Sequence, residues 1–275
     1  MRNHILILLC LLLLTGCTPS EPAPTQIPTV VETIPAATEI PTTAPTDVPT
    51  EAPTETPTEV PTEAPTLSSH SELYVPGVEV DDVITFFNEV CLNAEFVNSG
   101  DPSYLQRWNA PISYRIYGDP TAEDLAKLEE FTGWLNTIFG FPGIYEAGED
   151  DYVNLRIHFC DRETLLDLMG DHFWGTDGAV TFWYEDDVIY DAIICIRTDL
   201  DQYLRNSVIL EELYNGLGPV QDTDLRPDSI IYSPYSEPQS LTDIDKLILK
   251  LLYHPDLECG MSAAECEAVI RQLYY

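Results

Sequence analysis

Positively charged side chains are scarce in this chain of 275 residues, which has 12 Lys and Arg residues against 47 Asp and Glu residues. The formal net charge at pH 7 is −35. A protein of that charge repels phosphate backbones and anionic lipid headgroups, so the composition argues against nucleic acid and against anionic membrane surfaces as partners. Cations and basic molecules remain as compatible partners.

Histidine is also scarce, and the chain has no motif of a serine or cysteine hydrolase. Five histidines occur in total, and four lie after residue 17, namely His70, His158, His172 and His254. We expect His158 to pack within a strand, and His172 to lie in a loop. No Ser-His-Asp or Cys-His arrangement and no nucleophile-elbow motif is present, so the sequence does not indicate a serine or cysteine hydrolase.

Long hydrophobic runs are missing, apart from Ile5 to Leu14 after the basic Arg2. This run is typical of a secretory signal and is too short to span a bilayer comfortably. The Leu-Thr-Gly-Cys sequence that ends at Cys17 resembles the bacterial lipoprotein cleavage box. The resemblance implies that residues 1–17 form a lipoprotein signal, that Cys17 carries lipid, and that the acyl chains hold the protein on the extracytoplasmic face of the cell membrane. Ordinary secretion is the alternative.

Residues 18–70 repeat Pro, Thr and Glu with almost no aromatic side chains. Such a segment cannot form a core, so we predict a disordered, extended stalk that lifts the following domain away from the membrane. The sequence leaves glycosylation of its threonines open.

Residues 71–275 are long enough for one domain, and 44% of the whole chain is hydrophobic despite the polar stalk. Apolar periodicity and capping residues predict helices at 81–96, 121–139, 161–169 and 241–253, a last helix capped by Ser262, and strands at 111–117, 154–160, 179–184 and 188–196. In the second helix we expect Leu125, Leu128, Phe131 and Leu135 to face inward. The order predicts an α+β fold, with helices packed on a small twisted mixed sheet.

The most informative stretch runs from Val208 to Asp222 and reads as a helix that ends at glycine and proline. Glu211 and Asn215 lie four residues apart and share one face, and Glu212 lies beside Glu211. Gly218 allows a sharp turn that brings Gln221 or Asp222 back toward that face. The simplest interpretation is a solvated acidic face.

The same stretch resembles a metzincin zinc helix, His-Glu-x-x-His-x-x-Gly-x-x-His, whose zinc ligands have been replaced. Glu211, Asn215 and Gln221 stand at the three histidine positions, with Asp222 next to the last of them, whereas Glu212 and Gly218 keep the places of the catalytic glutamate and the glycine.

Three separated stretches resemble a bacterial family of uncharacterised, zincin-like extracytoplasmic domains, and together they extend from about Asp82 to Leu273. They comprise Phe87 to Val90 with Ala94 to Phe96, Arg107-Trp108 and Pro111-Ile112; Glu211 to Leu213 with Leu217-Gly218 and Asp222; and Leu241 to Asp243 with Asp245, Leu251 to Tyr253 and Gly260 to Ser262. The resemblance implies a zincin-like fold and no particular activity. Matrixin-type metzincins are more distantly similar, and at the position of their Met-turn this chain has Ile231 in place of methionine.

Zinc in proteins prefers nitrogen and sulfur ligands, whereas Glu211, Asn215 and Asp222 offer oxygen, which suits calcium or magnesium better. We therefore expect neither a catalytic zinc nor another cofactor. Two adjacent acids in a cleft need cationic or backbone partners, and Arg107 and Arg115 are the candidates. The cysteines permit disulfides in an exported protein, and a pairing of Cys259 with Cys266 stays open.

Two hypotheses about function follow. The first is a surface-tethered domain with a degenerate zincin-like site, which binds a protein, peptide or cell-wall ligand in a cleft at Glu211, Asn215, Gln221 and Asp222 without cleaving it. The alternative is an atypical metallopeptidase or other hydrolase, in which Glu212 is the catalytic residue and the metal has oxygen ligands.

Overall fold

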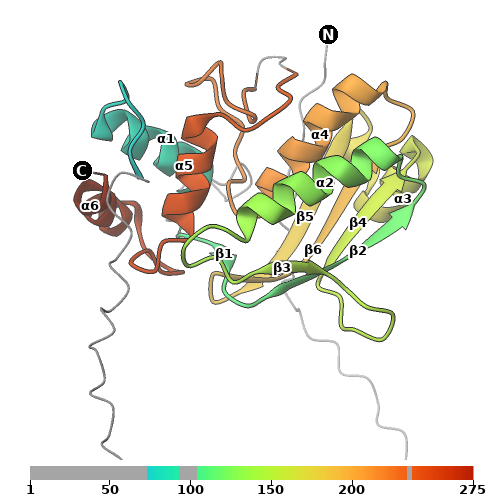
Figure 1. Cartoon of the computed structure of the whole chain (residues 1–275), viewed down its shortest axis with the longest axis horizontal. Coiled ribbons are helices and arrows are strands. Elements are labelled where there is room, and N and C mark those ends of the chain that lie inside the picture. The colour runs from blue at the N-terminus through green and yellow to red at the C-terminus, as the bar shows by residue number, and fades with distance from the viewer. Residues whose placement is uncertain (1–72, 93–103, 234–236, 275) are drawn as a thin grey trace, which may run out of the picture. The chain divides into compact units, whose positions relative to one another are not determined.

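A six-stranded, mostly parallel sheet forms the centre of the structure, a computed structural model that describes residues 73–92, 104–233 and 237–274 (Figure 1). Helices and strands follow along the chain in the order α1 (Val80–Leu92), β1 (Arg107–Trp108), β2 (Ile112–Gly118), α2 (Ala122–Leu135), β3 (Ile144–Glu146), β4 (Leu155–Cys160), α3 (Arg162–Met169), the 3-10 helix η2 (Asp171–Phe173), β5 (Gly178–Glu185), β6 (Val188–Arg197), α4 (Gln202–Asn215), α5 (Asp243–Leu252) and α6 (Ala263–Leu273).

The strand order in the sheet is β1-β6-β4-β2-β3, and β5 pairs with β6 from outside this path. β2, β4 and β6 are parallel neighbours, with Tyr114 opposite Leu155 and Leu155 opposite Ala192. β5 is antiparallel to β6. The prediction of a mixed sheet packed with helices is therefore confirmed, although its two shortest strands, β1 and β3, were not predicted.

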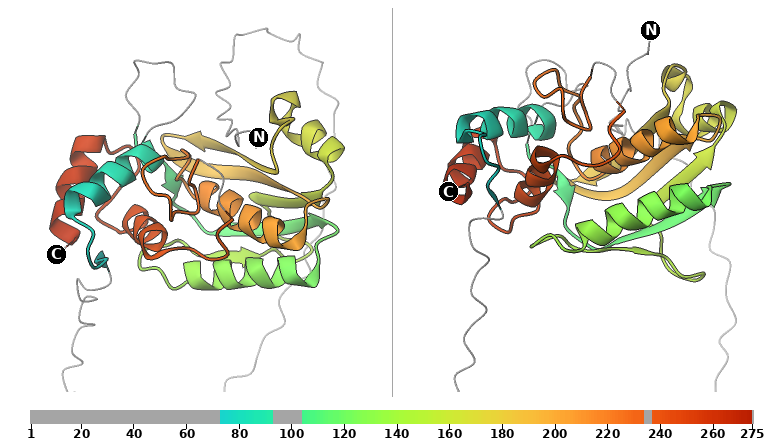
Figure 2. Two further views of the ribbon diagram at one scale, coloured as in Figure 1. Left: turned by 90° about the horizontal axis from the view of Figure 1, so that it is seen from above. Right: turned by 45° about the horizontal axis from the view of Figure 1, so that its top comes forward.

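The alternation of side chains along each strand decides which face of the sheet is buried. In β4, Leu155, Ile157 and Phe159 are buried, whereas the side chains between them are half-buried. Figure 2 shows α2 and α4 lying next to each other across one face of the sheet. The main hydrophobic core fills the space between these two helices and the buried side chains of the strands.

Most helix predictions are confirmed, including the inward positions of Leu128 and Phe131 in α2, whose N-cap is Thr121. The prediction for Leu125 is wrong, because its side chain is 42% exposed. Its neighbour Asp124 takes the inward position in that turn and is fully buried. Asp124 is buried in place of Leu125 because it forms an ion pair with Arg205 in α4.

Helices α1, α5 and α6 form a second group at one end of the sheet (Figure 1). The two ends of the described chain meet in this group, because the Tyr274 hydroxyl lies 3.1 Å from the Val75 carbonyl oxygen and 2.7 Å from that of Val78. Among the described residues, no helix combines the length and the apolar character needed to cross a bilayer.

A buried ion pair holds the N-terminal part of α4 against α2. Nε of Arg205 donates to Oδ1 of Asp124 at 2.9 Å, and Gln202 donates to the same oxygen at 2.6 Å. The other Asp124 oxygen accepts from the Thr121 amide, and Arg205 also donates to backbone carbonyls, among them that of Thr198. Both charges are thus fully hydrogen-bonded, which is the condition under which a buried pair is tolerated.

We predict that Asp124→Ala destabilises the domain by about 3–5 kcal/mol, because it leaves the Arg205 guanidinium buried without its counter-charge. Urea denaturation followed by circular dichroism measures the change. Glu129→Ala, at an exposed position of the same helix, is the matched control and should change the stability by less than about 0.5 kcal/mol. Equal effects of the two substitutions would contradict the role of the pair.

Candidate functional site

Helix α4 is buried along most of its length, since every residue from Arg205 to Asn215 is buried. The side chain of Glu212 is completely inaccessible, and that of Glu211 is only 9% exposed. The interpretation of these two glutamates as a solvated acidic face is therefore wrong. They lie inside the domain, where a carboxylate is costly unless it is paired.

Hydrogen bonds from distant elements fix the C-terminal end of α4. Nε1 of Trp108 donates to the carbonyl of Gly216 at 2.9 Å, and the Tyr253 hydroxyl donates to that of Leu217 at 2.8 Å. Gly218 has a φ of +127°, and a Cβ at this position would lie 2.7 Å from the carbonyl oxygen of Gln106. Only glycine satisfies both constraints, so the sharp turn predicted at this residue is confirmed.

The segment after this turn is attached to helix α1. Backbone amides of Val220 and Gln221 donate to the carbonyl of Val90 in α1. Beyond Asp222, the hydroxyl of Thr223 donates to Oε1 of Glu89, also in α1. Asp222 lies within this segment, and its charge acts on Glu212 of α4.

A carboxylate in α5 fixes the loop that continues from this segment. Asp245 is fully buried, and it accepts hydrogen bonds from the Ser229 hydroxyl at 2.6 Å, the Ile230 amide at 3.2 Å and the Thr242 amide at 2.9 Å. Burial raises the pKa of Asp245, and these donors lower it in part. The buried Ile231, at the position that the matrixin comparison assigns to methionine, lies in the same loop.

Glu212 packs directly against the backbone of β5, at a position where the sheet has no side chain. A Cβ on Gly178 would lie 2.7 Å from both Cγ and Oε1 of Glu212, and 2.6 Å from Cγ1 of Val208. The carboxyl group therefore occupies the space that any other residue at position 178 would fill.

Four carboxyl groups influence one another around this point. Burial raises the pKa of Glu212 well above its ordinary value of 4.5, and the charges of Glu211, Asp222 and Asp177 raise it further. Asp177 immediately precedes β5 and also accepts a bond from Arg197 at 2.9 Å. We call Glu211, Glu212, Asn215, Asp222 and Asp177 the α4 acidic site.

Two fully buried residues of the α4 acidic site have polar atoms without hydrogen-bond partners in the described part of the protein. They are both carboxyl oxygens of Glu212 and both amide atoms, Oδ1 and Nδ2, of Asn215. The hydroxyl of Ser207, one turn before Glu211 on the same helix, is in the same condition. Native proteins satisfy nearly all such groups, so this concentration on one helix calls for an explanation.

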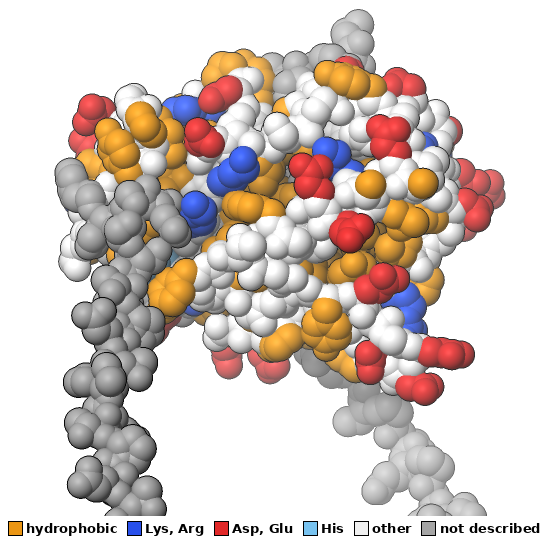
Figure 3. Space-filling model, viewed as in Figure 1, with side chains coloured by type: hydrophobic (Ala, Val, Ile, Leu, Met, Phe, Trp, Pro, Cys, Tyr) orange, Lys and Arg blue, Asp and Glu red, His pale blue; other side chains and the backbone are white. Residues whose placement is uncertain are grey.

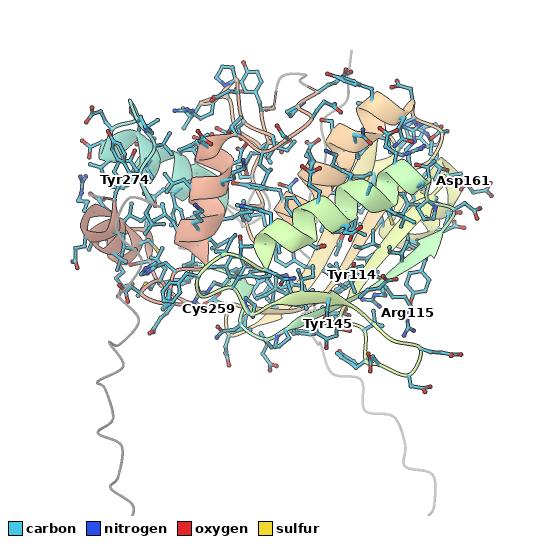
Figure 4. The ribbon with its side chains drawn as sticks, in the orientation of Figure 1. Tyr114, Arg115, Tyr145, Asp161, Cys259 and Tyr274 are labelled. Carbon is cyan, nitrogen blue, oxygen red and sulfur yellow. The ribbon has the colours of Figure 1, made fainter. Side chains whose placement is uncertain are left out.

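The cationic partners predicted for these acids are wrong. Arg107 donates to the backbone carbonyls of Leu252 and His254. Arg115 donates to the carbonyls of Gly148 and Glu149, and Figure 4 shows it on the side of the sheet away from α2. Both arginines stabilise loops, because backbone carbonyls near their own strands compete successfully for the guanidinium donors.

Histidine and cysteine side chains form neither a disulfide nor a metal site in the described ranges. His158 stacks on Tyr117 with ring centroids 4.7 Å apart, which agrees with its predicted packed position. Cys259 and Cys266 are free thiols, as are the other cysteines of the described residues. No three His, Cys, Asp or Glu side chains in the described ranges are arranged to hold a metal ion.

Sequence reasoning identified the helical part of the site and missed the part that comes from the sheet. Glu211, Glu212 and Asp222 come together with Asp177, which was not predicted. Gln221 is half-buried, and its amide nitrogen donates to the carbonyl of Asp222. The position of Ser207 in the site could have been predicted, because it lies four residues before Glu211 on the same helix. The local sequence around residues 177 and 178 contains nothing that connects them to α4.

Comparison with known proteins gives one result. A family model described as a protein of unknown function (DUF2927) matches residues 81–272. No curated protein and no solved structure matches the chain.

We predict that Glu212→Gln removes a pH-dependent loss of stability. Because the folded-state pKa of Glu212 lies above 4.5, the folded protein keeps a proton that the unfolded chain releases. The stability from this group is complete below the unfolded-state pKa and decreases as the pH rises toward the folded-state pKa, by at most about 1.4 kcal/mol per pH unit. Glutamine stays neutral, so the variant lacks this decrease.

Urea denaturation from about pH 5 to about pH 8 tests this expectation, and the difference in unfolding free energy between variant and wild type should grow with pH. Glu163→Gln removes the same charge from an exposed position of α3 and should leave the pH profile unchanged. A difference between Glu212→Gln and wild type that is independent of pH would contradict the prediction.

Proposed function

The chain belongs to the DUF2927 family of proteins of unknown function, and we propose that it is an extracytoplasmic, membrane-tethered domain that binds a ligand at the α4 acidic site without zinc-dependent cleavage. The observation that carries this proposal is the burial of Glu212 and Asn215 with all their side-chain polar atoms unpaired among the described residues. Buried polar groups without partners destabilise a fold, and a ligand that pairs with them explains their presence.

We also propose that the site is a degenerate relative of the zincin site. The order of structural features along the chain supports this proposal. A buried helix carries Glu211, Glu212 and Asn215 and ends at a glycine turn, after which the chain brings Asp222 back toward the helix. A glycine with a φ of +127° makes this turn, at the position where the metzincin pattern has its own glycine.

The choice of binding over zinc-dependent hydrolysis rests on the donors that the site offers. Carboxylate and amide oxygens are poor zinc ligands compared with imidazole nitrogen and thiolate sulfur. Without a metal-bound water, Glu212 has no nucleophile to activate in the manner of a zinc peptidase.

Hydrolysis by Glu212 is the second candidate, and one observation favours it. Burial moves the pKa of Glu212 upward, the direction in which enzymes shift a carboxylic acid that donates or accepts a proton near neutral pH. In this alternative, the metal has oxygen ligands or Glu212 acts directly on a water.

The membrane tether is proposed from the sequence, since Cys17 and the stalk lie outside the described residues. Leu14-Thr15-Gly16-Cys17 supplies the lipidation signal, and Pro-, Thr- and Glu-rich residues 18–70 supply the spacer. The ligand in this setting is a protein, a peptide or a component of the cell wall.

We expect the purified chain to contain less than about 0.1 zinc per molecule by mass spectrometry and to leave a mixed peptide library uncleaved. Glu212→Gln then has no peptidase activity to remove. One zinc per chain, together with peptide cleavage that Glu212→Gln abolishes, would contradict the binding function and support the hydrolase alternative.

We expect Cys17→Ala to release the protein from the membrane fraction of a bacterial host, because the variant cannot receive the lipid that anchors it. Cys10→Ala, inside the apolar run, is the matched control and should leave the protein in the membrane fraction. Retention of Cys17→Ala in membranes, with a wild-type protein that carries no lipid by intact mass, would refute the anchor.

A further inference from the structure

The unpaired polar atoms of the α4 acidic site define what a ligand must present. Glu212 offers two acceptor oxygens, and Asn215 offers one acceptor oxygen and one amide nitrogen that donates. The two residues are three positions apart on α4, so they are neighbours on one face of the helix. A ligand that satisfies them therefore needs several donors, a positive charge and one acceptor.

Among the described residues, no side chain supplies a positive charge to Glu212. Each arginine of the described residues donates to partners that the structure identifies, and none donates to Glu212. Arg197 reaches the rim of the site through Asp177, and its guanidinium is also bound to Asp199. Acidic side chains are spread over the surface in Figure 3, so a cation approaching this domain meets an attractive field.

The chemistry of the four atoms separates the possible cations. A primary ammonium group has three donors, which equals the number of acceptor atoms on Glu212 and Asn215. A calcium ion requires six to eight oxygen ligands, whereas Glu212 and Asn215 together offer three oxygens. A guanidinium group has five donors, which exceeds the three acceptor atoms on these two side chains.

Resting on the function proposed above, we infer that the α4 acidic site binds a primary ammonium group that has a carbonyl oxygen beside it, as at the free N-terminus of a peptide. The ammonium donates to the carboxylate of Glu212 and to Oδ1 of Asn215, and the carbonyl accepts from Nδ2 of Asn215. Gln221, Asp222 and Asp177 are half-buried, so in this inference the ligand enters on their side of the site.

Binding of this kind depends on pH in a way that identifies the amine. The groups that face Glu212 are Glu211 on the same helix, Asp177 before β5, Asp222 after the turn and Cys195 on β6. Burial and then these acids raise the pKa of Glu212, so the ligand displaces a proton and binds more tightly as the pH rises. Above the α-amino pKa of about 7.7–8.0 the ligand loses its charge and the affinity falls again.

Isothermal titration of the purified full chain with Ala-Ala, N-acetyl-Ala-Ala, butylamine and calcium chloride tests the inference. At about pH 7 we expect Ala-Ala to bind at least about tenfold more tightly than each of the other three. Glu212→Gln and Asn215→Leu should each weaken Ala-Ala by about tenfold or more, whereas the exposed control Glu163→Gln should bind like wild type.

Equal binding of N-acetyl-Ala-Ala would overturn the requirement for an ammonium group, and equal binding of butylamine would overturn the assignment to a peptide N-terminus. Tighter binding of calcium, lost in Glu212→Gln, would replace the ammonium with a metal. If a folded, zinc-free and inactive protein does not bind Ala-Ala at concentrations up to about 10 mM, the inference of an ammonium ligand is wrong, whereas the proposed binding function is not contradicted. Zinc with peptidase activity that depends on Glu212 removes the proposed function itself.

Discussion

Everything at the α4 acidic site depends on how α4 is held in the core. Near its start, Arg205 and Asp124 form a buried pair in which both charges are hydrogen-bonded. Near its end, Glu212 is equally buried, and its oxygens have no partner among the described residues. One helix thus combines a charge that is paired with a carboxyl group that is not, and the pair near its start offsets part of the stability lost by burying Glu212.

Local sequence was sufficient for most helices and for the longer strands. Thr121, Asp161 and Thr242 cap their helices through side-chain hydrogen bonds, and such caps are visible as residue patterns. The two- and three-residue strands β1 and β3 carry no periodicity and could not be found. Parallel pairing of β2, β4 and β6 also lies beyond local patterns, because it depends on which distant segments meet. The prediction that Leu125 faces inward was wrong for the same reason. Asp124 takes the inward position in that turn, because it pairs with Arg205, which is 81 residues away along the chain.

At the site, spacing along the helix predicted which residues share a face, and the tertiary fold determined the rest. Glu211, Glu212 and Asn215 follow from helical geometry, and the turn at Gly218 follows from glycine chemistry. Burial of the two glutamates could not be read from the sequence, because acidic residues on a helix are exposed in most proteins. Asp177 was also out of reach, since β5 brings it to α4 from a distant part of the chain.

The contact of Tyr274 with Val75 and Val78 determines how the domain responds to mechanical load. The described chain enters at residue 73, close to this contact, and α1 packs against α6 immediately beyond it. A pull on the N-terminal side therefore loads the junction between the first and last helices before it reaches the sheet or α4. The same load then reaches the edge of the α4 acidic site through α1, because the carbonyl of Val90 accepts hydrogen bonds from the backbone amides of Val220 and Gln221.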